Sequence, residues 1–433
     1  MKTKTTFKSL LAIIGLLLSF NLQAQDVPSI TIHVENAGSL SSFIAESKKY
    51  QIINLTLTGN LNGIDIRYIR EMAGRDYIGN ATNGKLTILN LADANIISGG
   101  GAYYHSGNNF SSTSNNSFGE FAFYNCTRLT SVILPNSLIL IETAAFQGCT
   151  GLTSVIIPDS VTSIGSSAFQ GCTGLTSVII PNSVTSIGSS AFQSCTKLTA
   201  IKIPKNITSI EATAFRGCTG LKEFIVLGEN ANYSTIDGVL FNKDRTTLIA
   251  YPNAKATTYT IPNSVTSIGA AAFQRCTGLI SIIIPVSVTS IGAFSFPSAF
   301  QDCTGLTEIH CKNPTPPKIA SYEFSVTIKQ LANLYVPKGS YSTYWLAVGW
   351  GDFVNIIEED ATAINTISKD KIAINTIANG IAIATKETTL ISIVNISGQK
   401  VYQSTINGNA EILLNKGVYI VKVNNESQKI IIQ

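Results

Sequence analysis

The stretch LTSVIIPDSVTSIGSSAFQGCTG occupies residues 152–174, and LTSVIIPNSVTSIGSSAFQSCTK occupies residues 175–197. The two copies differ at only three of their 23 positions. Self-similarity at a fixed period in this range indicates a solenoid, in which each repeat forms one coil of a stack. This repeat decides the fold, and the remaining segments are interpreted around it.

Within one repeat, the apolar residues follow the pattern of a coil with a strand on one side. Val155 and Ile157 alternate with residues of the opposite face, as in a strand. Pro158 ends the strand because it has no N–H group to donate. Phe169 and Cys172, three residues apart, predict one tight helical turn on the return path. Stacked coils bury these apolar edges together, and their strands form a parallel sheet.

The first position of the repeat can be followed along the chain. It recurs at intervals of 23 residues at Leu129, Leu152, Leu175, Leu198 and Leu221. A longer unit of 35 residues follows, the phase returns at Ala256, and Leu279 and Leu306 continue the series. Segments 52–57 and 86–91 show the same spacing of apolar residues at irregular distances.

The motif L-x-x-(V/I)-x-I-P-x-S-V-T-S-I-G-x-x-A-F-x-x-C recurs nearly unchanged in most units. It resembles the BspA-like class of leucine-rich repeat surface proteins over residues 52–358. The resemblance implies an α/β-type repeat solenoid with a parallel β-sheet on its concave face and few short helical turns. At the ninth position the superfamily usually carries Asn, whose amide bonds the next coil. Here a hydroxyl can do part of that work, because the position holds Ser137, Ser160, Ser183, Asn206, Ser264 and Ser287.

The N-terminal quarter of the chain predicts an export signal followed by a cap. Residues 1–24 combine early Lys residues with the apolar run LLAIIGLLLSF, which is typical of a secretory signal peptide removed after Ala24. A buried N-terminal helix is the alternative. The residue directly after Ala24 is Gln25 and not Cys, so we expect no lipoprotein anchor. Residues 25–128 predict an N-terminal cap, in which helical segments 39–50 and 63–74 cover the open first strand.

Residues 98–117, SGGGAYYHSGNNFSSTSNNS, lack periodicity and predict an exposed Gly/Ser/Asn-rich loop. Its Tyr103, Tyr104 and His105 either contact a ligand or are solvated loop residues. Both interpretations leave this segment outside the regular repeats, which occupy residues 129–358 together with a C-terminal cap.

The end of the repeat region is rich in large apolar side chains. They are either a C-terminal cap that closes the core or an aromatic platform for carbohydrate: Trp345, Trp350, Phe353, Ile356 and Ile357. BspA-like chains commonly end in a similar LYVP…W…F stretch, and this resemblance favours the cap. Residues 359–376 have no repeat phase and predict a linker.

Residues 377–433 predict a small all-β domain, a β-sandwich. Apolar and polar residues alternate there, and Ser397–Gly398, Asn407–Gly408 and Lys416–Gly417 supply turns. The segments ISGQKVYQ and LNKGVYIVKV and the final apolar strand that begins at Lys429 resemble the C-terminal sorting domains of the bacterial type IX secretion system. A sandwich module that binds a ligand is the alternative.

Seven of the eight cysteines occupy the same slot of the repeat, and Cys311 takes the place of a core Ile. Export permits disulfides, and neighbouring coils would place Cα atoms within bridging distance. The slot nevertheless lies between core residues Phe169 and Leu175, which favours buried free thiols. No CxxC pair is present, so we expect no zinc or other metal site.

No catalytic constellation is present in the sequence. The three histidines, His33, His105 and His310, lie in different regions, and no HExxH, GxSxG or Walker motif occurs. Repeats multiply the same side chains, whereas catalysis needs different ones to converge. We therefore expect no enzyme, no catalytic residue and no cofactor. The net charge of +4 includes three Lys in the first eight residues, within the predicted signal peptide, so the mature chain is nearer +1. A charge this small argues against nucleic acid and anionic membranes as partners.

Positions 2, 3 and 5 of the strand point away from the core, onto the concave face. A row of exposed Ile flanked by hydroxyls suggests an interaction site, although Ile and Thr also suit any sheet surface. The candidate binding residues are Ile133, Ile156, Ile179, Lys202, Ile225 and Ile283, with Thr153 and Thr176 beside them.

The resemblance to BspA-like proteins implies adhesion. We therefore expect an exported protein, secreted or attached to the outer membrane at the bacterial cell surface, without a transmembrane segment after processing. Its expected partners are extracellular proteins or cell-surface macromolecules of a host or of neighbouring cells. The alternatives are a structural envelope component without a specific ligand, or a glycan-binding protein.

Overall fold

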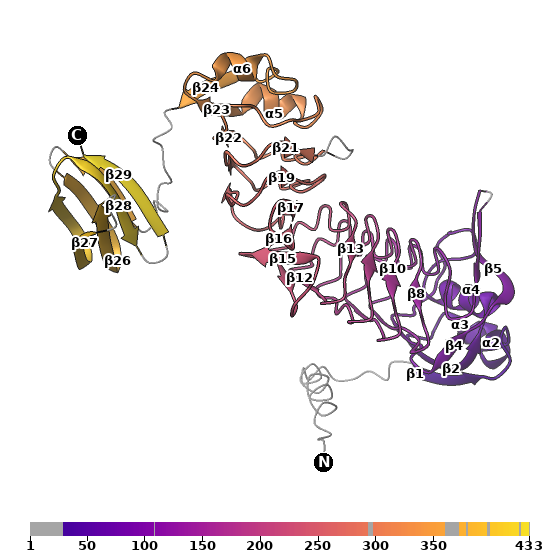
Figure 1. Ribbon diagram of the computed structural model, residues 1–433. Helices are drawn as coiled ribbons and strands as arrows, with labels where there is room; N and C mark the ends of the chain where they lie inside the picture. The colour runs from indigo at the N-terminus through magenta and orange to yellow at the C-terminus, as the bar shows by residue number, and fades with distance from the viewer. Residues whose placement is uncertain are drawn as a thin grey trace.

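The computed structural model describes residues 29–432, except residue 108 and residues 293–297, 360–371, 378–379, 396–398 and 424–425. The predicted signal peptide and most of the predicted linker lie outside the described residues. Figure 1 shows a solenoid of stacked coils that ends in two short helices, and a separate β domain at the C-terminus. The predicted solenoid class is confirmed.

A ladder of parallel strands runs along one side of the coils; we call it the first ladder. It is made of three sheets. The first contains β1(Ser29–Val34), β2(Asn54–Leu61), β3(Ile88–Asn90), β7(Ser131–Ile133) and β9(Ser154–Ile156), with β4(Ala94–Ile96) also on β2. The second contains β12(Ala200–Ile203) and β14(Glu223–Val226). The third contains β18(Thr258–Thr260), β20(Ser281–Ile284), β22(Glu308–Cys311), β23(Asn333–Pro337) and β24(Asn355–Glu359).

A second ladder, which the sequence did not predict, lies after the proline in the regular coils. Its first sheet contains β8(Leu140–Ile141), β10(Ser163–Ile164), β11(Ser186–Ile187) and β13(Ser209–Ile210). Its second sheet contains β17(Thr247–Ala250), β19(Ser267–Ile268) and β21(Ser290–Ile291), joined to the inserted strands β15(Tyr233–Ile236) and β16(Val239–Asn242). Ser163 pairs with Ser186, 23 residues later, so the register follows the repeat.

The return path of each coil is a succession of turns and not the expected helical turn. Ser167 and Gly171 adopt left-handed conformations, with φ of 56° and 71°. This conformation turns alternate N–H groups toward the next coil. The N–H of Phe169 donates to the carbonyl of Ala191 at 2.7 Å, and that of Gly171 to Gln193 at 2.7 Å.

Phenylalanines of successive return turns stack face to face inside the solenoid. The ring centroids of Phe146, Phe169 and Phe192 are 5.4 Å apart, with interplanar angles of 6° and 11°. The stack ends at Phe215, whose next ring contact, with Phe224, is edge-on. A second stack begins with Tyr251, Phe273, Phe300 and Phe324.

The long unit divides the solenoid into two stacks of coils. The buried residues form one cluster up to Leu240 and another from Val239 to Phe353. No pairing joins β14 to β18, or β13 to β17, among the described strands. We call this boundary the seam. Figure 1 shows that the stack changes direction there, around β12 to β17.

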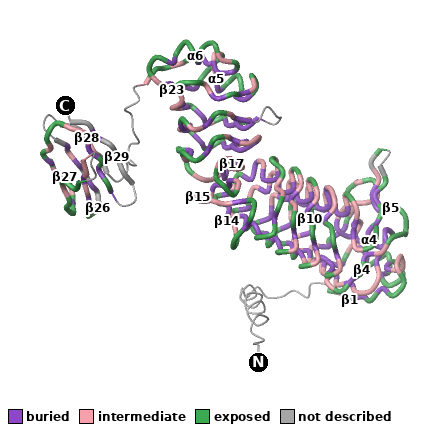
Figure 2. The backbone as a smooth tube through the Cα atoms, in the orientation of Figure 1, coloured by how far each residue is buried: buried purple, intermediate pink, exposed green. Residues whose placement is uncertain are grey.

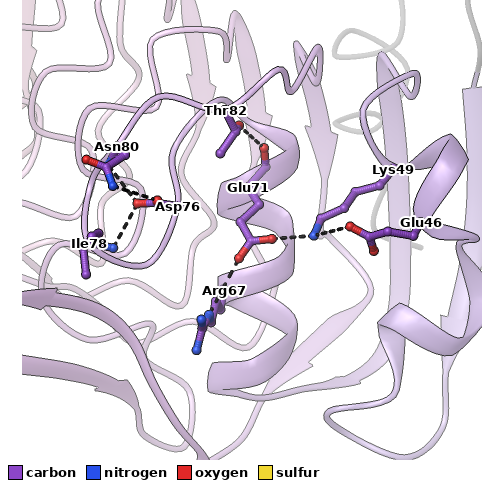
Figure 3. A network of polar contacts seen from close by, with 8 residues as sticks. All are labelled: Glu46, Lys49, Arg67, Glu71, Asp76, Ile78, Asn80 and Thr82. Carbon is purple, nitrogen blue, oxygen red and sulfur yellow. Dashed lines mark hydrogen bonds and ion pairs between the residues drawn. The ribbon is translucent and has the colours of Figure 1, made fainter.

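Short helices accompany the first coils. They are α2(Leu40–Phe43), α3(Glu46–Lys49) and α4(Gly63–Met72). Asn62 and Asp65 start α4 with a reciprocal capping box. The nearly buried Lys49 lies between the carboxylates of Glu46 and Glu71, and Figure 3 shows it joining α3 to α4. Its ammonium also lies 4.2 Å from the ring centroid of Tyr68.

The segment predicted as an exposed loop, 98–117, is a β-hairpin of β5(Gly99–Ser106) and β6(Asn109–Thr113). Tyr103 and Tyr104 are buried and belong to the first core cluster. The Tyr103 hydroxyl donates to the carbonyl of Glu120 at 2.7 Å. The loop prediction is therefore wrong, because these tyrosines anchor the hairpin to the coils.

The repeat region ends with α5(Val326–Leu331) and α6(Tyr341–Trp345), which pack beside β23 and β24. The C-terminal domain has its own core and consists of β25(Ile372–Ile377), β26(Gly380–Asn395), β27(Lys400–Leu413), β28(Gly417–Val423) and β29(Glu426–Ile432). Their pairing is antiparallel throughout. Residues 372–376, assigned to the linker from the sequence, belong to β25.

Candidate functional site

The fifth position of the first ladder faces away from the core, and in most coils its neighbours on both sides are buried. Val155 and Ile157 belong to the core, whereas Ile156 between them is 53% exposed. Ile179 in the next coil is 76% exposed, and the two residues pair in register. Figure 2 shows buried and exposed residues following one another along the coils.

The structure brings the predicted row together in three groups. Ile133, Ile156 and Ile179 are register neighbours on successive coils. Lys202 pairs with Ile225. Ile283 pairs with His310 beyond the seam. Ile133, Ile225 and Ile283 are partly covered, and Lys202 is exposed. The row is therefore interrupted twice: no strand pairing joins Ile179 to Lys202 among the described residues, and at the seam the inserted strands separate β14 from β18.

Threonine hydroxyls beside the row serve the backbone. Thr153 Oγ1 donates to the carbonyl of Thr130 at 2.9 Å, and Thr130 Oγ1 donates to Thr87 at 3.1 Å. Thr176 repeats this contact with Thr153 at 3.5 Å. Thr153 and Thr176 remain exposed, so they border the Ile row while their hydroxyls tie adjacent coils together.

The ninth position fulfils its expected role only in some coils, and toward the preceding coil. Ser160 Oγ donates to the carbonyl of Leu138 at 2.6 Å, and Asn206 Nδ2 donates to Asn182 at 2.8 Å. The buried hydroxyls without a partner among the described residues include Ser137, Ser183 and Ser287.

All eight cysteines are free and buried, as expected from the repeated slot and from the core position of Cys311. The thiol of Cys172 donates to the carbonyl of Phe146 at 3.2 Å, and Cys195 makes the same contact with Phe169 at 3.2 Å. Burial raises the pKa of the Cys218 thiol to about 12. These thiols are structural hydrogen-bond donors and poor nucleophiles.

The histidines do not converge. His33 bonds Thr58, and His310 Nδ1 lies 3.0 Å from a carboxylate oxygen of Glu359. His105 stacks on Phe110, which is 66% exposed at the tip of the hairpin. Among the described residues, no three His, Cys, Asp or Glu side chains gather as metal ligands would.

The apolar residues of the C-terminal cap divide between core and surface. Trp350 and Phe353 are buried, as the cap interpretation expects, and the Trp350 indole donates to the carbonyl of Pro317 at 2.8 Å. Trp345 is 58% exposed. The carbohydrate-platform alternative is therefore left with Trp345 as its exposed indole.

Sequence reasoning missed a pocket at the seam, which is lined by Arg216 and Gln274 among others. One signal was available in the sequence. Arg216 occupies the slot that holds Gln147, Gln170 and Gln193 in the preceding coils. A charged residue in a repeated Gln slot, next to the long unit, marks a departure from the coil-to-coil pattern.

Comparison with protein families decides the classification. The model of the BspA type leucine rich repeat region matches six copies over residues 116–246 and 249–344. The chain belongs to the BspA-type leucine-rich repeat family. A second family model, the secretion system C-terminal sorting domain, matches residues 363–433. This BspA-type protein is therefore exported by the type IX system to the cell surface or outside, and the predicted localisation is confirmed.

Solved structures similar to this BspA-type protein are bacterial leucine-rich repeat proteins. A leucine rich cell surface protein from Faecalibacterium prausnitzii is 27% identical with a TM-score of 0.37, covering 57% of this chain and 77% of that one. A leucine-rich repeat protein from Eubacterium ventriosum is 23% identical with a TM-score of 0.42, covering 59% of this chain and 85% of that one. The pneumococcal vaccine antigen PcpA is 21% identical with a TM-score of 0.34, covering 54% of this chain and 78% of that one.

A search of curated proteins finds no match. Both matching families consist of repeat and sorting modules, which are usually not enzymes. Among the described residues, no helix is long and apolar enough to cross a membrane.

Proposed function

We propose that this protein binds extracellular or cell-surface proteins through the Ile row of its first ladder, centred on Ile156 and Ile179. The observation that carries the proposal is the exposure of these two side chains, 53% and 76%, on adjacent coils. Large apolar side chains that meet in register on a rigid surface are costly to leave in water. A protein partner that covers them gains that free energy.

The surroundings of the row favour a protein partner of low charge. Thr153, Ser154 and Thr176 border it, and all three are exposed. Lys202 adds one positive charge at its edge. Such a surface suits a partner with an apolar anchor and hydroxyl or amide groups around it, whereas a nucleic acid would need many more cations. Family membership and export to the cell surface support an adhesive role.

The test is a binding screen of the full-length protein against immobilised extracellular matrix and cell-surface proteins. Each ligand is then retested with a variant that carries Ile156→Glu and Ile179→Glu, and with Phe110→Ala at the hairpin tip. The proposal expects binding that the double variant loses and Phe110→Ala retains. No binding to any protein would support a structural envelope component. Loss only with Phe110→Ala would move the site to the hairpin.

A further inference from the structure

A pocket opens at the seam, on the side of the return turns. It is lined by Phe215 and Arg216 of the first stack, by Ala250 of the inserted unit, and by Tyr251 and Gln274 of the second stack. The volume that the centre of a water molecule can occupy in it is about 20 Å³. One water needs roughly 10–15 Å³ on this measure. The pocket therefore has room for a small polar group.

Backbone donors that other coils satisfy are left open at this pocket. In each of four successive coils, the N–H of the stacked phenylalanine donates to a carbonyl of the next coil: Phe123, Phe146, Phe169 and Phe192. The series stops at Phe215, whose N–H makes no hydrogen bond to any residue that the structure describes. The N–H of Gly217, which is not among the residues that line the pocket, also makes no hydrogen bond to the described residues. Because the coils repeat, both groups are directed toward the seam.

Side chains in the pocket also lack partners. Arg216 Nε is buried without a hydrogen-bond partner among the described residues, and Arg216 Nη2 is 3.8 Å from Asp302. Burial and the neighbouring Arg275 lower the pKa of Arg216, so an anion beside it would be favoured. Gln274 is only 2% exposed, and its Oε1 accepts no hydrogen bond from the described residues.

The second stack shows which group suits such a turn. Phe300 occupies the same slot as Phe215, and the coil that would follow it is replaced by the C-terminal cap. There the carboxylate of Glu323 accepts the N–H group of Ala299, next to Phe300. A carboxylate thus takes the place of the missing carbonyls. At the seam, the acid of the first stack that lines the pocket is Glu211; it is exposed, and its carboxylate accepts no hydrogen bond from the described residues.

We propose that the seam pocket is a binding site for the carboxylate of a ligand. The N–H group of Phe215 and the Nε of Arg216 donate to it, and Gln274 Oε1 accepts from a donor on the same ligand. Hydrogen bonds from a guanidinium to a carboxylate are among the stronger ones in proteins. Return turns and strands of the second ladder line most of the site, and Phe224 of β14 is its one lining residue from the first ladder; Ile156 and Ile179 do not line it.

The experiment measures the melting temperature and binding of the full-length protein with three probes. They are acetate, N-acetyl-diglycine, which presents a peptide carboxylate, and the amide of the same peptide. Potassium chloride at equal ionic strength is the reference. The variant Arg216→Gln restores the residue of Gln147, Gln170 and Gln193 and should fold. Arg128→Gln, at an exposed site outside the pocket, makes the same change of charge.

The proposal expects both carboxylates to bind and raise the melting temperature, and the amide and chloride to have no effect. Arg216→Gln should weaken carboxylate binding at least tenfold, and Arg128→Gln should leave it unchanged. A crystal grown with acetate should show it in the pocket. Acetate alone binding would point to a free small acid, and the peptide binding more tightly would point to a peptide end. Equal binding by Arg216→Gln, or an equal effect of chloride, would overturn the proposal.

Discussion

At the scale of single residues, the cysteine slot shows how one position serves every coil. The thiol replaces a small apolar group and also donates to the carbonyl of the preceding coil, as Cys172 does to Phe146. We expect no reaction of the native protein with a thiol reagent at pH 8, because access is blocked and burial raises the thiol pKa values. In denaturant without reductant, eight thiols per chain should titrate. Few titratable thiols would show bridges between coils.

Glu323 should make the stability depend on pH. Burial raises the pKa of its carboxyl from 4.5 to about 7, although the N–H groups of Ala299 and Phe300 oppose this rise. Between pH 4.5 and 7 the folded state therefore holds a proton that the unfolded state has lost. The free energy of unfolding should fall as pH rises through this window, by an amount on the order of 3 kcal/mol.

The measurement is urea unfolding of the parent and of Glu323→Gln at pH 5 and pH 8. The parent should lose more stability than the variant between these pH values, because Gln does not titrate and still accepts a hydrogen bond. Glu229→Gln, at an exposed acid, is the control and should behave like the parent. Equal losses in the parent and in Glu323→Gln would contradict the role of Glu323.

Residue-level features differ in how far the sequence predicts them. The exposed and buried alternation of Val155, Ile156 and Ile157 follows from the strand period, and the structure confirms it. The unpaired donors of Phe215 and Gly217 could not be predicted, because they depend on whether the next coil is in place. Only the Arg in a Gln slot at Arg216 signalled the pocket.

At the scale of elements, the stacked phenylalanines hold the return turns in register. Phe169 has ring neighbours at 5.4 Å on both sides and is fully buried. We expect Phe169→Ala to destabilise the protein by about 3–5 kcal/mol. The damage should be local, because each coil contacts mainly its neighbours.

Hydrogen exchange of the Phe169→Ala variant can locate this damage. Faster exchange should be confined to the coils of Phe146, Phe169 and Phe192, while the second stack keeps its protection. Phe110→Ala removes an exposed ring and should leave both stability and exchange unchanged. A uniform loss of protection across the seam would mean that the two stacks unfold as one unit.

Sequence reasoning predicted the first ladder, the helix at α4 and the antiparallel strands of the C-terminal domain, because long periodic segments carry their own signal. The second ladder was missed because two-residue strands such as Ser163–Ile164 show no alternation. The hairpin was missed because Tyr103 and Tyr104 are adjacent and both buried, with a register shift between Gly99 and Tyr104. Packing against the coils, and not local periodicity, decides that segment.

At the scale of the whole molecule, the solenoid and the sorting domain have separate cores. Deleting residues 363–433 should therefore leave the repeats folded but block their delivery. In a native host, we expect the truncated protein to accumulate in the periplasm, and cell fractionation checks this. Unchanged delivery to the surface would show that export does not depend on the C-terminal domain.

The central claim is that the Ile row is a recognition surface and more than sheet chemistry. The side chains of Ile156 and Ile179 leave no cavity when replaced, because they point away from the core. The double change to Glu should cost on the order of 1 kcal/mol of stability. In a covered patch it should remove about 2 kcal/mol or more of binding free energy, roughly a 30-fold loss of affinity.

The most direct measurement is the dissociation constant of a screened protein ligand for two double variants, with thermal melts of both. One carries Ile156→Glu and Ile179→Glu, and the other carries Thr162→Glu and Thr185→Glu, which adds the same charges at exposed sites by the second ladder. We predict that both fold and that only the Ile variant loses affinity, by about 30-fold or more. Parent-like binding by a normally folded Ile variant would contradict the claim.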